Sequence, residues 1–217
     1  MFTFPLKALL AKPLPKSKIY QFAQLNSTVK GLFVQQIESI TWQYKLAPET
    51  INLPATPAIA EIQIFDVSLK GSECDGNILR CIDAAIPFHI FYRLFTKDAV
   101  QFTGAFKRRS ETAHDKFVIE GYFSSDWLPI GSPCEPLPLA LNLESLYEQM
   151  LQALLPTSLR PHESLNDQVS RLNELQKKKT ECQKLESRLQ KEKQFNRKVE
   201  INAQIRMLKT AISLLEN

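Results

Sequence analysis

The last third of the chain carries the apolar pattern that most constrains its fold. From Glu163 onward, apolar residues recur at steps of mainly three and four, which are the a and d spacings of a coiled coil. The pattern consists of two stripes that are out of phase, because continuing the first beyond Leu189 reaches Glu192 and Asn196 instead of Ile201. The first stripe comprises Leu165, Val169, Leu172, Leu175, Cys182, Leu185 and Leu189, and the second comprises Ile201, Ile205, Leu208, Ile212 and Leu215.

This phase slip predicts that the helix reverses direction between the two stripes. An uninterrupted helix would leave one stripe unburied, whereas a turn lets the stripes face each other. We therefore expect residues 162–217 to form a basic antiparallel helical hairpin, or coiled coil. The alternative is one continuous helix of about 54 residues, roughly 80 Å long, because residues 190–200 contain neither glycine nor proline.

The segment "KEKQFNRKVEIN", residues 191–202, places the aromatic Phe195 among charged and amide neighbours at the slip. We expect its ring to cover the end of the hairpin seam and Asn196 to cap the return helix. An exposed ring that contacts a partner is the alternative. Coiled coils recognise other helices through their apolar seam, so the expected partner-binding residues are Leu172, Leu185, Leu189, Phe195, Ile201, Ile205, Leu208 and Ile212.

The positive charge of the chain belongs to this tail. Residues 158–217 hold 13 Lys and Arg against 8 Asp and Glu, a net charge of +5, and residues 1–157 hold 14 against 15. Such a surface is either the solvated face of a coiled coil or a contact for nucleic-acid phosphates. For the second reading, the candidate residues are Lys177, Lys178, Lys179, Arg197 and Lys198 in the tail, and Lys107, Arg108, Arg109 and Lys116 around a predicted turn at 107–116.

Residues 1–157 have the pattern of an α+β domain with the order α-β-α-β-β-β-α. The first helix is predicted over residues 25–46, where Val29, Phe33, Ile37, Ile40 and Tyr44 have helical spacing and Ser27 is a candidate N-cap. A strand rich in β-branched and aromatic residues follows at 61–70, and then a short helix over 78–86, which Asp75 or Asn77 caps and Pro87 closes.

Three further strands are predicted at 88–95, 99–109 and 116–127, with short connections typical of an antiparallel meander. Asn142 is a candidate cap for a last helix over 143–155, and Pro156 and Pro161 mark the boundary to the tail. The predicted fold class is thus α+β: a small, mainly antiparallel sheet with packing helices, followed by the C-terminal coiled-coil hairpin.

No segment carries the signature of a reaction. The best candidate is a degenerate restriction-type nuclease site, in which Glu38, Glu61 and Gln63 would stand for the acidic and lysine residues that hold magnesium. Cys74, Cys81, Cys134 and Cys182 form no C-x-x-C pair. We therefore expect no cofactor and no metal site. The sequence favours a protein without catalytic activity over an enzyme.

The chain lacks the run of about 20 apolar residues that a spanning helix requires. Its first residues, "MFTFPLKALLAKPLPK", are interrupted by Lys7 and by prolines, unlike a signal peptide. A cytoplasmic location and no membrane contact are the resulting expectations.

Several segments together resemble an uncharacterised bacterial and archaeal domain-of-unknown-function family over essentially the whole chain. They are "LAPETINLPATPAIAEIQIFDVSLK", "ILRCIDAAIPFHIFYRL", "NLESLYEQML" and, above all, "KEKQFNRKVEIN". Genes for such proteins lie beside helicases, DNA methyltransferases and restriction components, so the resemblance implies an accessory subunit of a restriction-like or anti-phage defence system. It supplies no catalytic residues.

Three functions follow from these observations, in decreasing order of support. The first is an interaction subunit that docks a helicase, a methyltransferase or its own copy through the tail. The second is a protein that binds DNA directly through the basic tail and the 107–116 tip. The third is the degenerate nuclease.

Overall fold

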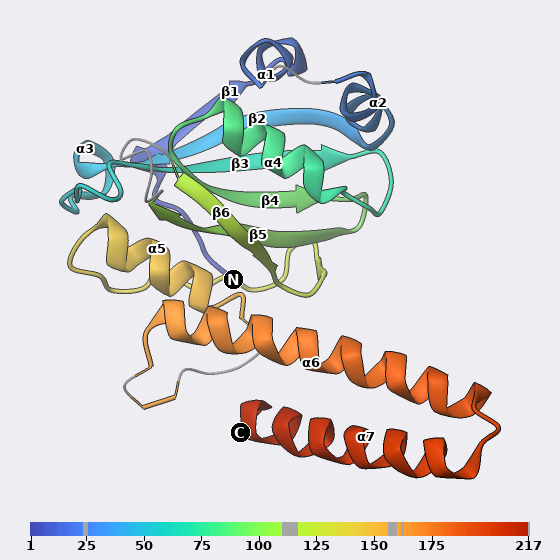
Figure 1. Cartoon of the computed structure of the whole chain (residues 1–217). Helices are drawn as coiled ribbons and strands as arrows, with labels where there is room; N and C mark the ends of the chain where they lie inside the picture. Colours follow the sequence, from blue (N-terminus) through green and yellow to red (C-terminus); the bar gives the residue numbers. More distant parts are fainter. Residues whose placement is uncertain (24–25, 110–116, 156–159, 162, 217) are drawn as a thin grey trace. The chain divides into compact units, whose positions relative to one another are not determined.

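The computed structural model describes the chain except for residues 24–25, 110–116, 156–159, 162 and 217, and except for the side chains of 108 and 109. The chain folds as two units, Met1–Leu155 and Pro156–Asn217. The first is a mixed α+β unit and the second is helical (Figure 1). Among the described helices, none combines the length and the apolar character that crossing a membrane demands.

The α+β unit is built on a seven-stranded sheet with the order β1-β2-β3-β4-β5-β6, in which β7 also pairs with β5 (Figure 1). All neighbours are antiparallel except β3 and β4, which are parallel and joined by α4. The strands are β1 (Leu9–Pro13), β2 (Ile37–Leu46), β3 (Ile62–Leu69), β4 (His89–Phe95), β5 (Ala99–Arg109), β6 (Phe117–Ser124) and β7 (Leu128–Pro129).

Three helices cover one face of this sheet: α1 (Lys16–Phe22), α2 (Ser27–Gln36) and α4 (Gly76–Ala85). The side chain of Asp75 caps α4 by accepting a hydrogen bond from the backbone N–H of Asn77, and the helix ends before Pro87. The core beneath the helices consists of apolar residues from both layers: Ile19, Phe33, Ile37, Ile40, Phe65, Val67, Leu69, Ile78, Leu79, Ile82, Ile90, Tyr92 and Leu94.

The opposite face holds α5 (Leu143–Gln152), whose N-cap is Asn142 in a capping box with Ser145. Successive residues of a strand point to opposite faces. Tyr92 of β4 belongs to the core beneath the three helices, so the preceding residue, Phe91, points to the opposite face. On that face, a Cβ built on Gly104 of β5 would lie 3.3 Å from Phe91 and only 2.5 Å from the Leu151 side chain. Glycine at 104 therefore lets α5 approach the sheet. Two short elements, η1 (Leu6–Ala8) and α3 (Pro48–Ile51), complete the unit.

The prediction of one helix over residues 25–46 is wrong in its second half. The helix ends at Gln36, and Ile37, Ile40 and Tyr44 lie in β2, which pairs with β3 along its whole length. This segment is rich in β-branched and aromatic residues, which favour strands, and pairing with β3 overrides the helical spacing. The N-cap is Asn26, whose side chain accepts from the N–H of Val29, not Ser27.

The fold class is confirmed: the structure is α+β, with a mostly antiparallel sheet and a long helical C-terminal region. The predicted strands at 61–70, 88–95, 99–109 and 116–127 correspond to β3, β4, β5 and β6, and the predicted helices at 78–86 and 143–155 correspond to α4 and α5. The sheet is larger than expected, because β1, β2 and β7 were not predicted as strands.

The helical unit is a hairpin of α6 (Leu165–Lys191) and α7 (Phe195–Glu216), so the continuous-helix alternative is wrong (Figure 1). The apolar seam contains Cys182, Leu185, Leu189, Ile201, Ile205, Leu208 and Ile212. Two exposed ion pairs join the helices in the same antiparallel register: Lys209 Nζ lies 2.8 Å from Glu186 Oε1, and Lys179 Nζ lies 2.6 Å from Glu216 Oε1.

The turn between the helices differs from the prediction at two residues. The Glu192 carboxylate accepts from the N–H groups of Lys193 and Gln194 at 2.8 and 2.9 Å, so residues 192–194 form the turn. Asn196 lies inside α7 and is not its cap. Phe195 is 77% exposed and does not cover the seam.

Replacing Gly104 with alanine tests the close approach of α5. Gly104→Ala is expected to lower the free energy of unfolding by about 1–3 kcal/mol, because the added methyl group overlaps the Leu151 side chain. Urea unfolding followed by tryptophan fluorescence measures this change, since Trp42 and Trp127 both belong to the α+β unit. The matched control is Gly121→Ala in β6, where a Cβ meets nothing within 4 Å. Equal effects at the two glycines would contradict the explanation.

Candidate functional site

A buried polar cluster centred on Asp83 joins α4 to three strands. Tyr92 of β4 donates a hydrogen bond to Asp83 Oδ2 at 3.0 Å, and Tyr122 of β6 donates to the same oxygen. Lys107 Nζ lies 2.7 Å from Asp83 Oδ1 and donates to the carbonyl oxygen of Phe88 at 2.8 Å. One carboxylate thus contacts two hydroxyl groups and one ammonium group.

Burial changes the pKa values of the two tyrosines in this cluster. Removal from water raises the pKa of Tyr92 and of Tyr122, and the negative charge of Asp83 raises both further. Both hydroxyl groups therefore remain protonated and act as donors to Asp83 at neutral pH. Lys107 is only 4% exposed at its side chain and balances the Asp83 charge.

A cavity of about 670 Å³ opens beside the cluster. It lies between the second half of α4, the end of β5 and the start of β6. The Arg80 guanidinium, one turn before Asp83, lies 5.8 Å from the centre of the Tyr122 ring. Most of the remaining walls are apolar. The lining residues are Arg80, Asp83, Ala84, Ile86, Pro87, Lys107, Phe117, Val118 and Ile119.

His89 lies near the cluster and is also buried. Its ring makes edge-to-face contacts with Phe117 and Tyr147, each with a centroid distance of 4.9 Å. Burial and, secondarily, the positive charge of Lys107 lower the pKa of His89 to about 3. The imidazole is therefore neutral at physiological pH and is a packed core residue.

A second ion pair lies between β3 and β4, where Arg93 donates to both Asp66 oxygens at 2.6 and 2.7 Å. Its guanidinium is surrounded by the rings of Phe4, Tyr44 and Phe95 at 5.4–5.7 Å. Burial raises the pKa of Asp66, although Arg93 opposes that rise. Both partners are satisfied, and the pair links neighbouring strands.

The three nuclease candidates do not come together. Glu38 lies in β2 and not in a helix, beside the β3 residues 68–69, whereas Glu61 immediately precedes the other end of β3. An eight-residue strand separates them, a distance of roughly 25 Å. Gln63 donates to Glu61, and Lys45 pairs with Glu61 at 3.2 Å. Over the described part of the chain, no group of three or more His, Cys, Asp and Glu residues is placed to hold a metal ion.

Among the nucleic-acid candidates, Lys107 is removed from the predicted basic tip, because its ammonium group is buried against Asp83. Arg108 and Arg109 are the last residues of β5, but their side chains lie outside the described residues, as does the whole of Lys116.

In the tail, Lys178 pairs with Glu174 at 3.3 Å, and Lys179 pairs with Glu216. Lys177, Arg197 and Lys198 are exposed.

Most of the predicted partner-binding residues pack inside the hairpin. Ile201 and Ile205 are buried, and Leu185, Leu189, Leu208 and Ile212 pack against them. Leu172 is half-buried in α6. The seam is thus occupied within the chain, and Phe195 alone among the predicted residues projects a largely exposed apolar side chain.

Sequence reasoning missed a second apolar stripe on α7. Val199, Met207 and Leu214 are 54%, 74% and 70% exposed. Each lies two positions from a seam residue, about 200° around the helix, and therefore on the side opposite the seam. We call Phe195, Val199, Met207 and Leu214 the outer stripe. A helical projection of residues 195–216 contains this signal, but the stronger seam pattern obscures it.

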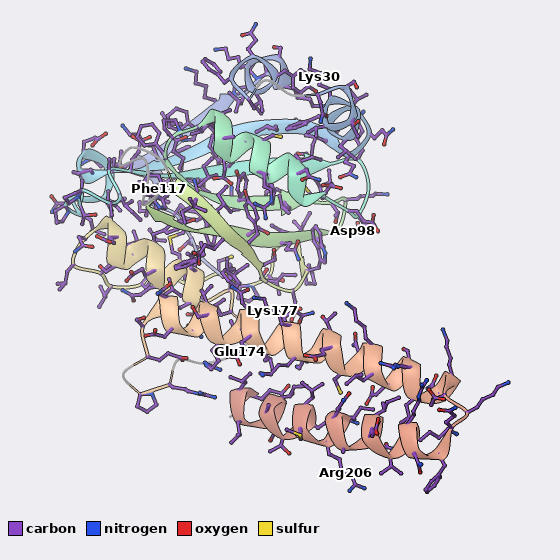
Figure 2. All side chains as sticks on the ribbon, viewed as in Figure 1. Lys30, Asp98, Phe117, Glu174, Lys177 and Arg206 are labelled. Carbon is purple, nitrogen blue, oxygen red and sulfur yellow. The ribbon has the colours of Figure 1, made fainter. Side chains whose placement is uncertain are left out.

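The side chain of Arg206, next to Met207, projects from α7 on the side away from α6 (Figure 2). Lys177 and Glu174 extend from α6 (Figure 2). Residues 195–216 contain four basic residues, Arg197, Lys198, Arg206 and Lys209, and two acidic residues, Glu200 and Glu216. The outer stripe is therefore apolar and lies on a helix of net positive charge.

A family model described as a domain of unknown function, DUF4391, matches residues 2–212. The chain belongs to the DUF4391 family. The match covers the α+β unit and nearly all of the hairpin, so both units are parts of the DUF4391 domain. No curated protein and no solved structure matches the chain.

The depressed pKa of His89 predicts that acid destabilises the α+β unit. Between pH 6.5 and about 3, the unfolded chain binds a proton at His89 that the folded chain does not, so stability falls as pH falls. From pH 7 to pH 5 this residue is expected to remove about 2 kcal/mol. Urea unfolding at several pH values measures the loss.

His89→Gln provides the comparison, because glutamine does not titrate. The variant is expected to have a smaller loss of stability from pH 7 to pH 5 by about 2 kcal/mol, whatever its stability at pH 7. The same pH dependence in both proteins would contradict the assignment.

The structure predicts that Lys107 stabilises the fold. Lys107→Met leaves the buried Asp83 charge without its cation and is expected to lower the free energy of unfolding by about 3–5 kcal/mol. Lys107→Met combined with Asp83→Asn is expected to regain part of this loss, because the amide oxygen still accepts from the tyrosines. Urea unfolding measures both changes. The prediction would be contradicted if Lys107→Met left the stability unchanged and weakened binding to duplex DNA. Lys107 would then contact nucleic acid.

Proposed function

We propose that this protein is a non-catalytic accessory subunit of a restriction-like or anti-phage defence system in the cytoplasm. Its hairpin docks a partner enzyme, a helicase or a DNA methyltransferase. The α+β unit serves as the folded body that carries this hairpin. The proposal is supported by the outer stripe of α7 and by the family resemblance noted in the sequence.

The observation that carries the proposal is the exposure of four large apolar side chains of α7, which spread over roughly a third of the helix circumference away from the seam. Isolated exposed apolar residues are common on protein surfaces, but several on one side of a helix that is already packed on its other side indicate an interaction surface. A patch of this kind matches the way an amphipathic helix is recognised, through anchors three, four and seven positions apart. Phe195 and Val199, and Met207 and Leu214, have such spacings.

Charge indicates the chemistry of the partner segment. The outer stripe lies beside Arg206 and on a helix with four basic and two acidic residues. A partner helix with acidic residues beside its apolar stripe would complement it, as flanking charges choose partners in coiled coils. A second copy of α7 would instead bring basic residues together. A partner protein is therefore favoured over self-association.

Direct binding to DNA is less well supported. Lys107 is buried, and Lys178 and Lys179 pair with carboxylates, which leaves Lys177, Arg197 and Lys198 from the described candidates. Each neutralised phosphate adds salt-sensitive affinity, but a few exposed cations with acids between them give a weak interaction. On this proposal, DNA reaches the complex through the partner enzyme.

Met207→Glu tests the docking surface at its centre. The protein is co-expressed with the products of the genes on either side of its own, and complex formation is measured by size-exclusion chromatography with light scattering. Met207→Glu is expected to abolish the complex or weaken it at least about tenfold, because it places a charge in the apolar contact. Its own fold should persist, because Met207 is 74% exposed.

The matched control is Leu139→Glu, which places the same charge on a 97% exposed leucine of the α+β unit. This variant should bind the partner as the unsubstituted chain does. A complex that survives Met207→Glu would show that the outer stripe is not the docking surface. A homodimer of the chain alone that Met207→Glu disrupts would assign the stripe to a second copy and overturn the choice of partner.

A further inference from the structure

We propose that the cavity beside Asp83 binds a small organic anion, a molecule with an apolar body and one carboxylate or phosphate group. The site lies wholly within the α+β unit, between α4 and the strands β5 and β6. It is independent of the outer stripe on the hairpin. The proposal therefore stands or falls separately from the docking function.

A buried ion pair lies directly beneath the cavity. Asp83 and Lys107 line it, and their side chains are 0% and 4% exposed. A buried ion pair of this kind is seldom more stabilising than apolar residues of similar volume, because both charges lose their hydration. A few polar groups next to an otherwise apolar cavity are also typical of ligand sites.

The tyrosine ring links this floor to the cavity rim. Tyr122 donates its hydroxyl hydrogen to Asp83, and the Arg80 guanidinium packs over its ring at 5.8 Å. The hydroxyl end of Tyr122 is thus held by Asp83, and the face of its ring by Arg80. Arg80 and Asp83 are three positions apart on α4, so their side chains lie on the same side of the helix.

The Arg80 guanidinium is the positive group that would bind the anionic group of the ligand. Among the described residues, no carboxylate forms an ion pair with it, whereas the Lys107 charge is already balanced by Asp83. Among the described lining residues, the charged groups are Arg80, Lys107 and Asp83, and their formal charges sum to +1. A guanidinium group binds a carboxylate or a phosphate through paired N–H groups. An anionic group next to Arg80 is therefore the complementary occupant.

The remaining walls select the body of the ligand. Ile86 and Pro87 follow α4, and Phe117, Val118 and Ile119 belong to β6. These side chains offer apolar surface to an alkyl chain or an aromatic ring. The volume of about 670 Å³ lies within the range of small-molecule sites, roughly 300–1,000 Å³.

Binding of anilinonaphthalene sulfonate to the full chain tests the site, because this probe joins an aromatic body to an anion and becomes fluorescent when bound. Saturable binding is expected, with a Kd at least about tenfold higher for Arg80→Gln, which removes a charged hydrogen-bonding group. Ala84→Trp should also block the probe by filling the cavity from an exposed position on its lining. Circular dichroism confirms that the variants are folded.

Two control variants separate this site from other surfaces. Arg206→Gln makes the same substitution on α7 and should leave the affinity unchanged. Met207→Glu replaces an apolar side chain of the outer stripe and should leave the saturable binding of the probe unchanged. Competition by octanoate and by phenyl phosphate then identifies the preferred anionic group, and displacement by either supports the site.

Probe binding that is equal in the unsubstituted chain and in both Arg80→Gln and Ala84→Trp would overturn the proposal. Failure of both competitors to displace the probe would do the same. A signal lost in Met207→Glu but kept in Arg80→Gln would assign the probe to the hairpin and also overturn the cavity site.

Discussion

The contact on which the α+β unit depends is the anchoring of α4 by Asp83. This carboxylate contacts Tyr92 of β4, Lys107 of β5 and Tyr122 of β6, so one side chain fastens the helix across three consecutive strands. The helix also forms the crossover between the parallel strands β3 and β4. A crossover helix must pack back on its sheet. Here apolar burial supplies the attraction, and the Asp83 network fixes the position, because hydrogen bonds and charges require particular distances.

The parts of the fold that the sequence predicts are those in which local pattern and tertiary environment agree. β3 to β6, α4, α5 and the hairpin have clear periodicity, a cap or a proline boundary, and each forms as expected. Residues 37–46 fail because helical spacing and strand composition conflict there. Pairing with β3 decides the conflict, and β3 lies more than 15 residues further along the chain. No local pattern reports that partner.

The candidate sites were harder to predict for the same reason. Lys107 next to two arginines indicates a basic turn, yet Asp83, 24 positions earlier, neutralises it once β5 packs beside α4. Glu38 and Glu61 have plausible residue types for a nuclease, but the register of β2 and β3 places them at opposite ends of a strand. Site residues are defined by which elements meet. Residue type and spacing within one element predict them only when, as in the hairpin seam, the contacting elements are neighbours in sequence.

The hairpin leaves one physical question that its own packing does not answer. Two helices have a single mutual interface, and the seam around Ile201 and Ile205 already fills it. α7 nevertheless presents Phe195 and Met207 to water on its other side, where burial of each would contribute roughly 1.5–3 kcal/mol. A third helix packed there would bury both apolar faces of α7, as in a helical bundle. The outer stripe is therefore better explained as half of an interface than as a feature of the isolated hairpin.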